Sequence, residues 1–375
     1  MIAWYDAPSL TASAALAARI AELTDGKSLP ELDLRPTGVR VRIDEADLAA
    51  AVEAAAGELG MTADPAAPQV VRLSFDAVDT PAVRSFWQGA LGYEAAGDGL
   101  VDPLRREPAI SFHPQEPPRL LRNRIHVDIV RVAEAVEAFR TSFGQHPYGA
   151  YGLTLKDAEG NEMDLVPGGT WPEQPATDDW RLLFSAMTFY PTTSSQQTVE
   201  LAGTVAALAD AAGRPLLIDL RPDGVTIDTG KDQWENDETA FAALAAEIQT
   251  AARELGLIAD PARLRFVQFA FDAVDIPAVR AFWLSVLGYQ RDPRDFLTDI
   301  YDPRRLTPVI MFQQLDPEDP RRQQRDRVHL DLFVPADQVR ARLATGVEAG
   351  GTLLADGHTL ADPEGNEVGI LTLDG

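Results

Sequence analysis

Cysteine is absent from the chain of 375 residues. This excludes disulfides, thiolate catalysis and cysteine-based zinc sites, and it fits a reducing compartment. Long apolar runs are also absent, since no stretch approaches the roughly 20 residues that cross a bilayer. The opening residues MIAWYDAPSL contain neither the basic nor the apolar region of a signal peptide. The sequence therefore predicts a cytoplasmic protein without a membrane partner.

Basic residues are few. The chain has 33 Lys and Arg against 58 Asp and Glu, which gives a formal net charge of −25. Such an excess of negative charge repels phosphate backbones, so we expect no nucleic-acid partner. Apolar residues make up 45% of the chain, which is enough for real cores. The length alone suggests two or three domains of about 150 residues each.

One stretch of the sequence occurs twice. Residues 71–94 read VRLSFDAVDTPAVRSFWQGALGYE, and residues 267–290 read VQFAFDAVDIPAVRAFWLSVLGYQ. A second pair matches LDLRPTGVRV at 32–41 with IDLRPDGVTI at 218–227. The chain is therefore a tandem duplication, and the cluster of Pro and Gly at 167–180 predicts the junction between its halves.

Each copy of the first stretch has the pattern of a strand, a turn and a helix. Leu73 and Phe75 alternate with polar neighbours, which is the period of a strand with one apolar face. Asp79 and Pro81 suit a helix start, and Gly92 suits its end. The apolar positions between them lie on one helical stripe: Val83, Phe86, Trp87, Ala90 and Leu91. We expect this stripe to pack against the sheet.

The smaller segments, residues 1–62 and 180–258, share an order of a helix, the LDLRP or IDLRP strand and an alanine-rich helix ending in ELG. This order resembles the pterin-4a-carbinolamine dehydratase fold. In that family a His-His-Pro motif before the strand moves the proton of the substrate. The matching positions here are 28–31 and 214–217, and neither contains histidine. We expect degenerate scaffold domains without dehydratase activity.

The larger segments, residues 68–168 and 263–373, share several spaced signatures. These are a strand with D-A-V-D, a helix with F-W, L-G-Y, a later H-x-D strand and a closing D-x-E-G-N-E. Together they resemble the glyoxalase-like branch of the vicinal oxygen chelate superfamily. The resemblance implies an α+β fold in which paired βαβββ modules form a cup. It also implies a divalent metal held by His, Gln or Glu, in a fold that hosts lyases, isomerases, dioxygenases and metal-free resistance proteins.

The metal positions that the resemblance implies are incompletely filled. The first-strand position holds Arg72 in the first half and Gln268 in the second, and arginine has no accessible lone pair for a metal. The closing-strand glutamate position holds Asp164 and Gly369, respectively. Because neither half shows a full ligand set, we expect no metal cofactor.

A His-x-Asp pair recurs in both halves, as His126 with Asp128 and as His329 with Asp331. Residues two apart project from the same face of a strand. Such a pair can brace the sheet, orient a ligand or contribute to a metal site. His126 is the best candidate for a general acid or base, and Asp164 is the second catalytic candidate.

We expect each half to form one cup. The expected ligand-binding positions of the first half are Arg72, Asp76, His113, His126, Asp128, Glu162 and Asp164. Those of the second half are Gln268, Asp272, Gln313, His329, Asp331 and Glu367. His146 and His358 lie in loop-like segments without a histidine counterpart, and no role is assigned to them.

Three functional hypotheses remain open. The leading one is a metal-independent cup that binds or transforms a small organic molecule, with a role in resistance, sequestration or secondary metabolism. The alternative is a lyase, isomerase or dioxygenase that uses one divalent metal in the first half, held by His113, His126 and Asp164. In a third, one half only supports the other, and Gly369 makes the second half the passenger. The only partner expected is a small molecule, and the protein is a monomer or homodimer.

Overall fold

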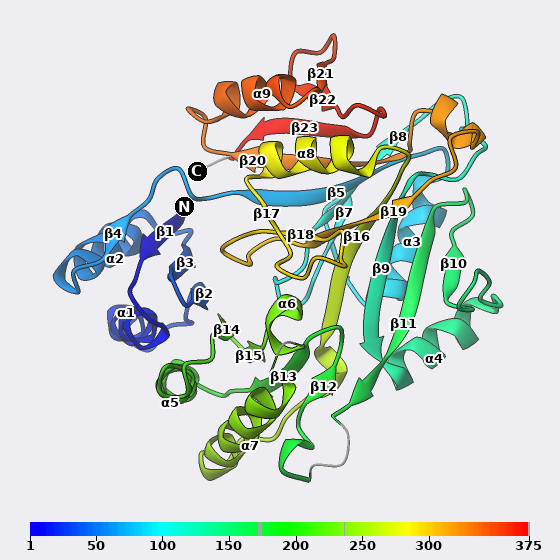
Figure 1. The fold of residues 1–375 in the computed structure, drawn as a ribbon. Helices are drawn as coiled ribbons and strands as arrows, with labels where there is room; N and C mark the ends of the chain where they lie inside the picture. The colour runs from blue at the N-terminus through cyan, green and yellow to red at the C-terminus, as the bar shows by residue number, and fades with distance from the viewer. Residues whose placement is uncertain (172–174, 236, 374–375) are drawn as a thin grey trace. The chain divides into compact units, whose positions relative to one another are not determined.

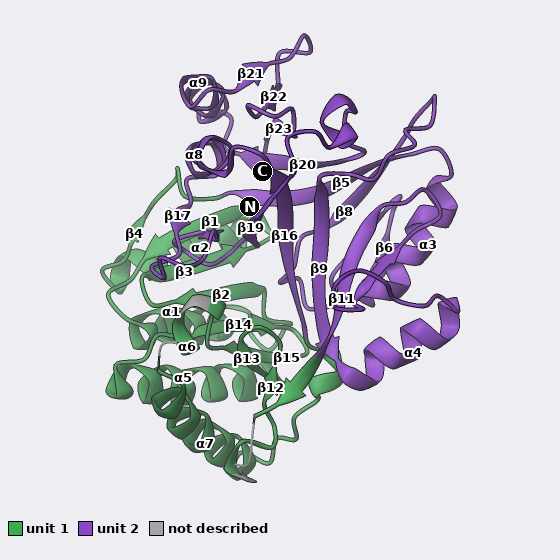
Figure 2. Cartoon of the chain, turned by 45° about the vertical axis from the view of Figure 1, so that its right-hand side comes forward, with its two compact units in different colours: residues 1–68, 168–264, 374–375 green, residues 69–167, 265–373 purple. Residues whose placement is uncertain are grey.

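The computed structural model describes residues 1–171, 175–235 and 237–373. Its contacts divide the chain into two compact units, coloured separately in Figure 2: unit 1 with residues 1–68 and 168–264, and unit 2 with residues 69–167 and 265–373. Both units combine helices and sheets, which confirms the α+β class. The four predicted domain boundaries stay a prediction. The predicted junction at 167–180 includes residues 172–174, which lie outside the described residues.

Unit 1 takes helices and strands from both halves of the chain (Figure 1). They are β1 Ile2–Asp6, α1 Leu10–Leu23, β2 Glu31–Arg35, β3 Gly38–Arg42, α2 Ala46–Glu58, β4 Thr62–Ala63, β12 Arg181–Leu182, β13 Ala186–Pro191, α5 Ser195–Ala212, β14 Leu217–Arg221, β15 Gly224–Asp228, α6 Lys231–Trp234 and α7 Glu238–Glu254. The strands follow the order β12-β13-β15-β14-β2-β3-β1-β4. Strands β2 and β14 pair antiparallel, which joins the two halves in one sheet.

The repeated sequence signals of unit 1 give repeated local structure. Helices α1 and α5 each begin after a serine, Ser9 and Ser194, whose side chain accepts a hydrogen bond from a backbone N–H of the first turn. Such N-caps satisfy donors that the helix itself cannot satisfy. Apolar residues of both helices enter one buried cluster with the strands of the sheet. The two halves of unit 1 therefore share a core.

A buried ionic cluster lies where β2 and β14 pair. Asp33 and Asp219 are directly opposite each other in the register. Asp33 accepts hydrogen bonds from Arg40 at 2.6 Å and Arg221 at 2.7 Å, and Arg35 lies 2.8 Å from Asp219. Burial alone raises the pKa of Asp33, but the arginines together hold it well below its usual value. The paired guanidinium groups therefore allow two aspartates to lie side by side in the sheet.

Unit 2 contains two sheets. From the first half it takes β5 Val70–Ala77, α3 Thr80–Leu91, β6 Glu94–Ala96, β7 Gly99–Val101, β8 Ile110–Pro114, β9 Ile125–Val132, α4 Ala133–Phe143, β10 Thr154–Lys156 and the start of β11 Glu162–Thr170. From the second half it takes β16 Arg265–Ala273, α8 Ile276–Leu287, β17 Gln290–Arg291, β18 Ile300–Tyr301, β19 Val309–Gln314, β20 Val328–Val334, α9 Val339–Glu348, β21 Thr352–Leu353, β22 Thr359–Ala361 and β23 Glu367–Thr372. One sheet follows the order β21-β22-β23-β20-β5-β8-β7-β6, and the other contains β17-β18-β19-β16-β9-β11, with β10 on β11.

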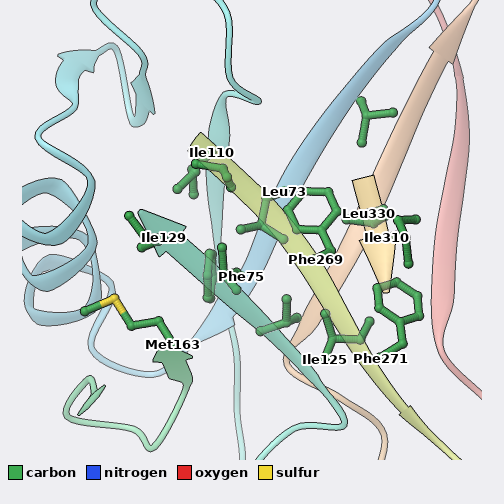
Figure 3. Close-up of a cluster of buried hydrophobic side chains, with 14 of the residues drawn as sticks. Leu73, Phe75, Ile110, Ile125, Ile129, Met163, Phe269, Phe271, Ile310 and Leu330 are labelled. Carbon is green, nitrogen blue, oxygen red and sulfur yellow. The ribbon is translucent and has the colours of Figure 1, made fainter. Parts of the chain in front are cut away.

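The predicted strand, turn and helix are present in both copies. Asp79 caps α3 by accepting a hydrogen bond from the backbone of Ala82, and Asp275 caps α8 in the same way. Both helices end at a glycine with positive φ, Gly92 and Gly288. The predicted stripe of α3 is buried and packs in a cluster that receives side chains from both sheets (Figure 3). This part of the sequence analysis is confirmed.

The two halves exchange strands in unit 2. Strand β5 of the first half pairs antiparallel with β20 of the second, with Ser74 opposite His329. Strand β16 of the second half pairs with β9 of the first, with Gln268 opposite Asp128. Each sheet therefore combines one βαβββ module from each half. The expectation that each half forms its own cup is wrong for these strand pairings.

Two fully buried arginines fix this exchange. Arg124 of the first half donates to the Oδ1 atom of Asn366 at 3.1 Å and to the carbonyl of Arg321 at 3.0 Å. Arg327 of the second half donates to the Oδ1 atom of Asn161 at 2.8 Å and to a carbonyl of the first half. A buried arginine is costly unless its donors find acceptors. Because those acceptors come from the opposite half, the exchanged arrangement supplies hydrogen-bond acceptors to both guanidinium groups.

Candidate functional site

A cavity of about 280 Å³ opens on the sheet that contains β5 and β20, and we call it site A. Its ionisable lining residues are Asp76, His113, Arg325, His329, Asp331, His358 and Glu367. These residues share one face of the sheet because side chains alternate between the two faces along a strand. Asp76 of β5 is in register with His113 of β8, and Asp331 of β20 is in register with Gly369 of β23. Both halves of the chain therefore build site A.

Two carboxylates of site A are held by arginines. Asp76 accepts a hydrogen bond from Arg119 at 3.0 Å. Glu367 receives two hydrogen bonds from Arg325, at 2.6 and 2.7 Å. The bidentate pair of Glu367 fixes the orientation of that carboxylate as well as its charge. These two acids therefore form an anchored polar wall.

Asp331 is held differently. Its Oδ2 atom accepts a hydrogen bond from the hydroxyl of Ser74 at 2.6 Å. Its Oδ1 atom lies where a side chain at Gly369 would begin, since a Cβ built on that glycine would be 2.6 Å away. Glycine at 369 therefore leaves room for the Asp331 carboxylate. Position 369 of β23, where the resemblance implies a glutamate, is thus next to the carboxylate of Asp331 from β20.

Two imidazoles face this carboxylate. The rings of His113 and His329 stack with centroids 5.9 Å apart. Burial lowers the pKa of His329, and His113 lowers it further, while Asp331, Asp76 and Glu367 raise it. The net shift is downward. His329 is therefore neutral near pH 7 and presents one ring nitrogen as an acceptor.

The corresponding face of the other sheet, site B, contains His126, Asp128, Glu162, Asp164, Gln268, Asp272 and Gln313. The amide of Gln268 donates to Asp128 at 2.7 Å, and His126 lies 3.6 Å from the same carboxylate. The hydroxyl of Thr154 donates to Asp164 at 2.6 Å. Site B thus contains the same histidine and aspartate pair in a different hydrogen-bonded setting.

Glu162 and Asp272 of site B are also anchored. Glu162 accepts hydrogen bonds from Arg122 and from the hydroxyl of Tyr148, both at 2.7 Å. Burial, followed by Glu162 itself, raises the pKa of Tyr148. Asp272 accepts a hydrogen bond from Arg321 at 2.5 Å and is largely buried. Arginines thus hold both carboxylates in place, and the predicted ligand-binding roles of Glu162 and Asp272 stay predictions.

The family model described as "Glyoxalase-like domain" matches residues 72–166 and 268–371, more than half of the chain. The chain belongs to this family. A crystal structure of a glyoxalase I mutant from Zea mays aligns with a TM-score of 0.40 at 10% identity, covering 81% of this chain and 94% of that chain. That likeness is too low to carry an argument. No curated protein matches the chain.

Each site takes residues from both glyoxalase-like regions. Site A combines Asp76 and His113 of the first region with His329, Asp331 and Glu367 of the second. The predicted cup of the first half, which joined Asp76 to His126, is therefore separated into two sheets. The cause is strand pairing: β9 and β20 carry nearly the same residues, so the sequence does not reveal which of them pairs with β5.

The predicted metal set of His113, His126 and Asp164 is not assembled, because β8 and β9 lie in different sheets. Two other groups in the described part of the glyoxalase-like regions bring ligand atoms within 4.8 Å of one another. The first is His113, His329 and Asp331 in site A. The second is His126, Asp128 and Asp164 in site B.

The donor atoms of site A fit a divalent cation. Two imidazole nitrogens and one carboxylate oxygen match the preferences of zinc or iron(II), with positions left for water or substrate. In site B the carboxylates of Asp128 and Asp164 already accept hydrogen bonds from Gln268 and Thr154. The Asp331 carboxylate of site A likewise accepts one from Ser74, but site A offers two imidazole nitrogens where site B offers one, so site A matches these metals better.

Arg72 does not line the cavity in the way that the sequence analysis expected. It is directly opposite Asp331 in the register, but its guanidinium lies 4.5 Å from the ring centroid of Phe333. Gln268 is buried and braces Asp128. Gln313 is exposed on β19. The ligand-binding roles of these three residues stay predictions.

Sequence analysis missed four contributors to site A: Ser74, Arg325, His358 and Thr359. Ser74 lies two residues before Asp76 on the same strand face, so strand alternation could have revealed it. Arg325 lies four residues before His329 and repeats Arg122 of the first half. His358 and Thr359 follow a loop, and no pattern in the sequence indicates that they reach the cavity.

None of the helices in the described ranges has the length and apolar character needed to span a bilayer.

Proposed function

We propose that site A binds a small polar organic molecule and that His329 accepts a proton from it. The observation that carries the proposal is the cavity lined by three carboxylates and by the imidazoles of His113, His329 and His358. Its volume of about 280 Å³ lies just below the roughly 300–1,000 Å³ typical of ligand pockets. A compact ligand fits this size.

The electrostatics of site A suit proton transfer to His329. The ring is neutral near pH 7 because burial lowers its pKa, so it can act as a base. The carboxylates of Asp331, Asp76 and Glu367 each favour the imidazolium. They therefore stabilise the charge that appears on the ring once it has taken a proton. Asp331, held by Ser74 and given room by Gly369, is the positioning residue of this pair.

The test is a thermal-shift screen of small polar molecules against the wild type and three histidine variants. A ligand at about 100 times its dissociation constant adds about 2.7 kcal/mol to the free energy of unfolding. We expect this gain in the wild type and its loss in His329→Ala. His146→Ala is the matched control, because His146 is exposed and outside both sites. A ligand whose effect is lost in His126→Ala and kept in His329→Ala contradicts the proposal.

The second candidate function is catalysis with a divalent metal in site A. The convergence of His113, His329 and Asp331 favours it. A bound metal polarises a substrate oxygen or lowers the pKa of a bound water. Elemental analysis of protein purified without chelators tests this candidate. About one ion per chain, lost in His113→Ala and in His329→Ala, supports it, and equal metal content in all three proteins contradicts it.

For unit 1 we propose two degenerate pterin-dehydratase-like domains that serve as scaffold. The positions that hold the His-His-Pro motif in that family include Leu29 and Leu216 here, and both are buried in the apolar cluster of unit 1. Buried leucines cannot move a substrate proton. A dehydratase assay with a pterin carbinolamine tests the proposal, and turnover above the uncatalysed rate contradicts it.

A further inference from the structure

The charges of site A do not balance. Three carboxylates line the cavity, those of Asp76, Asp331 and Glu367. Arg119 compensates Asp76, and Arg325 compensates Glu367. In the described part of the chain, the hydrogen bond of Asp331 comes from the neutral hydroxyl of Ser74. Three negative charges therefore face two positive ones, and the excess charge belongs to Asp331.

Arg72 is the cation best placed to neutralise Asp331, because the two residues are directly opposite on paired strands. Cross-strand neighbours of opposite charge ordinarily interact. Here the guanidinium of Arg72 instead lies over the ring of Phe333, 4.5 Å from its centroid. A cation over an aromatic face gains energy from the ring quadrupole. The carboxylate of Asp331 is thereby left for a ligand.

The imidazole rings of His113 and His329 stack with centroids 5.9 Å apart, and one nitrogen of each lies within 4.8 Å of a carboxylate oxygen of Asp331. Gly369, which also lines the cavity, leaves the Oδ1 atom of Asp331 uncovered from the side of β23. At the equivalent place in the first half the chain has Asp164. Because of this difference between the halves, the carboxylate of Asp331 is accessible in site A.

We propose that site A takes ligands that carry one positive charge, namely protonated amines, with the carboxylate of Asp331 as the acceptor of the ammonium group. This inference rests on the proposed function and names the ligand class of the same cavity. An ammonium group bound there donates to Asp331 while the remainder of the ligand contacts the two imidazoles. An anionic ligand of the same size meets an uncompensated negative charge and is disfavoured.

Three probes of nearly equal size test the ligand class: benzylamine, benzyl alcohol and benzoate. They share a ring and differ in the charge of the attached group. Binding is measured by titration calorimetry at pH 7 with EDTA present, so that metal ions do not contribute. We expect benzylamine to bind more tightly than the other two. Asp331→Asn should weaken benzylamine by roughly tenfold to hundredfold, the range for one hydrogen bond to a charged group.

Two further variants complete the experiment. Gly369→Ala places a Cβ 2.6 Å from the Oδ1 atom of Asp331, so it should weaken the binding of benzylamine without changing any charge. Asp337→Asn is the control, because it removes the same charge as Asp331→Asn at an exposed position of the same module. It should leave benzylamine binding unchanged.

The outcomes separate the ligand class from the proposed function. If benzyl alcohol or benzoate binds as tightly as benzylamine and depends on His329, the ammonium class is overturned and the proposed function stands. If benzylamine binds equally well to the wild type and to Asp331→Asn, the ammonium class is overturned as well. If none of the probes binds at millimolar concentration, the ligand class falls, and the screen described above decides the function.

Discussion

Replacing Asp326 by asparagine should stabilise the protein near neutral pH. Asp326 lies two residues before β20 and is 6% exposed. Its Oδ1 atom accepts a hydrogen bond from the backbone N–H of Arg124 at 3.0 Å, and its Oδ2 atom lies 3.3 Å from the guanidinium of Arg124. Burial nevertheless raises the pKa of Asp326 to about 6. The equivalent residue of the first half is Asn123, which is uncharged.

The sign and size of the effect follow from proton linkage. The folded-state pKa of Asp326 lies above the ordinary value of 3.8, so the folded protein retains a proton that the unfolded chain has already released. Stability is therefore lost as pH rises from about 4 to about 6. The difference of about two pKa units corresponds to about 3 kcal/mol. Asparagine removes this loss and keeps an acceptor for the N–H of Arg124.

Urea unfolding of the wild type and Asp326→Asn from pH 4 to pH 7.5 measures this effect. We expect equal midpoints near pH 4 and a rising advantage of the variant up to about pH 6, constant above it. Asn123→Asp is the reverse control and should destabilise at pH 7, because it turns a carboxylate toward the Oδ1 atom of Asn161, which now accepts from Asn123. An Asp326→Asn variant that is less stable at pH 7, or whose advantage is independent of pH, refutes the reasoning.

Two further predictions concern buried polar contacts. Asp33→Ala leaves the guanidinium groups of Arg40 and Arg221 without their carboxylate and should lower the free energy of unfolding by about 3–5 kcal/mol, measured by urea denaturation; a loss below about 1 kcal/mol contradicts the burial of this cluster. Trp283→Phe removes the hydrogen bond from its indole to Asp362 and should cost about 1–3 kcal/mol, measured in the same way; an unchanged midpoint contradicts it.

Much of the local structure could be predicted from the sequence because the signals are short-range. The start of α3 is determined by Asp79 and Pro81, and its end by Gly92, all within the repeated stretch. The apolar stripe of α3 is buried as its spacing predicts. These features depend on neighbours a few residues away and not on how the sheets are assembled.

The composition of the sites could not be predicted for a specific reason. His126 and His329 occur in nearly identical strands, so the sequence does not distinguish pairing within a half from pairing between halves. Gly369 illustrates the consequence. From the sequence alone, Gly369 stands where the resemblance implies a metal-ligating glutamate. In the structure, its lack of a side chain leaves room for the carboxylate of Asp331. That role depends on the register of β20 and β23, which is a tertiary property.

The exchange of strands in unit 2 has a genetic consequence. Each half of the gene encodes one wall of site A and one wall of site B, so neither half alone encodes a complete pocket. A half produced separately could complete its pockets only by pairing with a second copy of itself or with the missing half. Each half of the duplicated chain therefore depends on the other half to complete its sites.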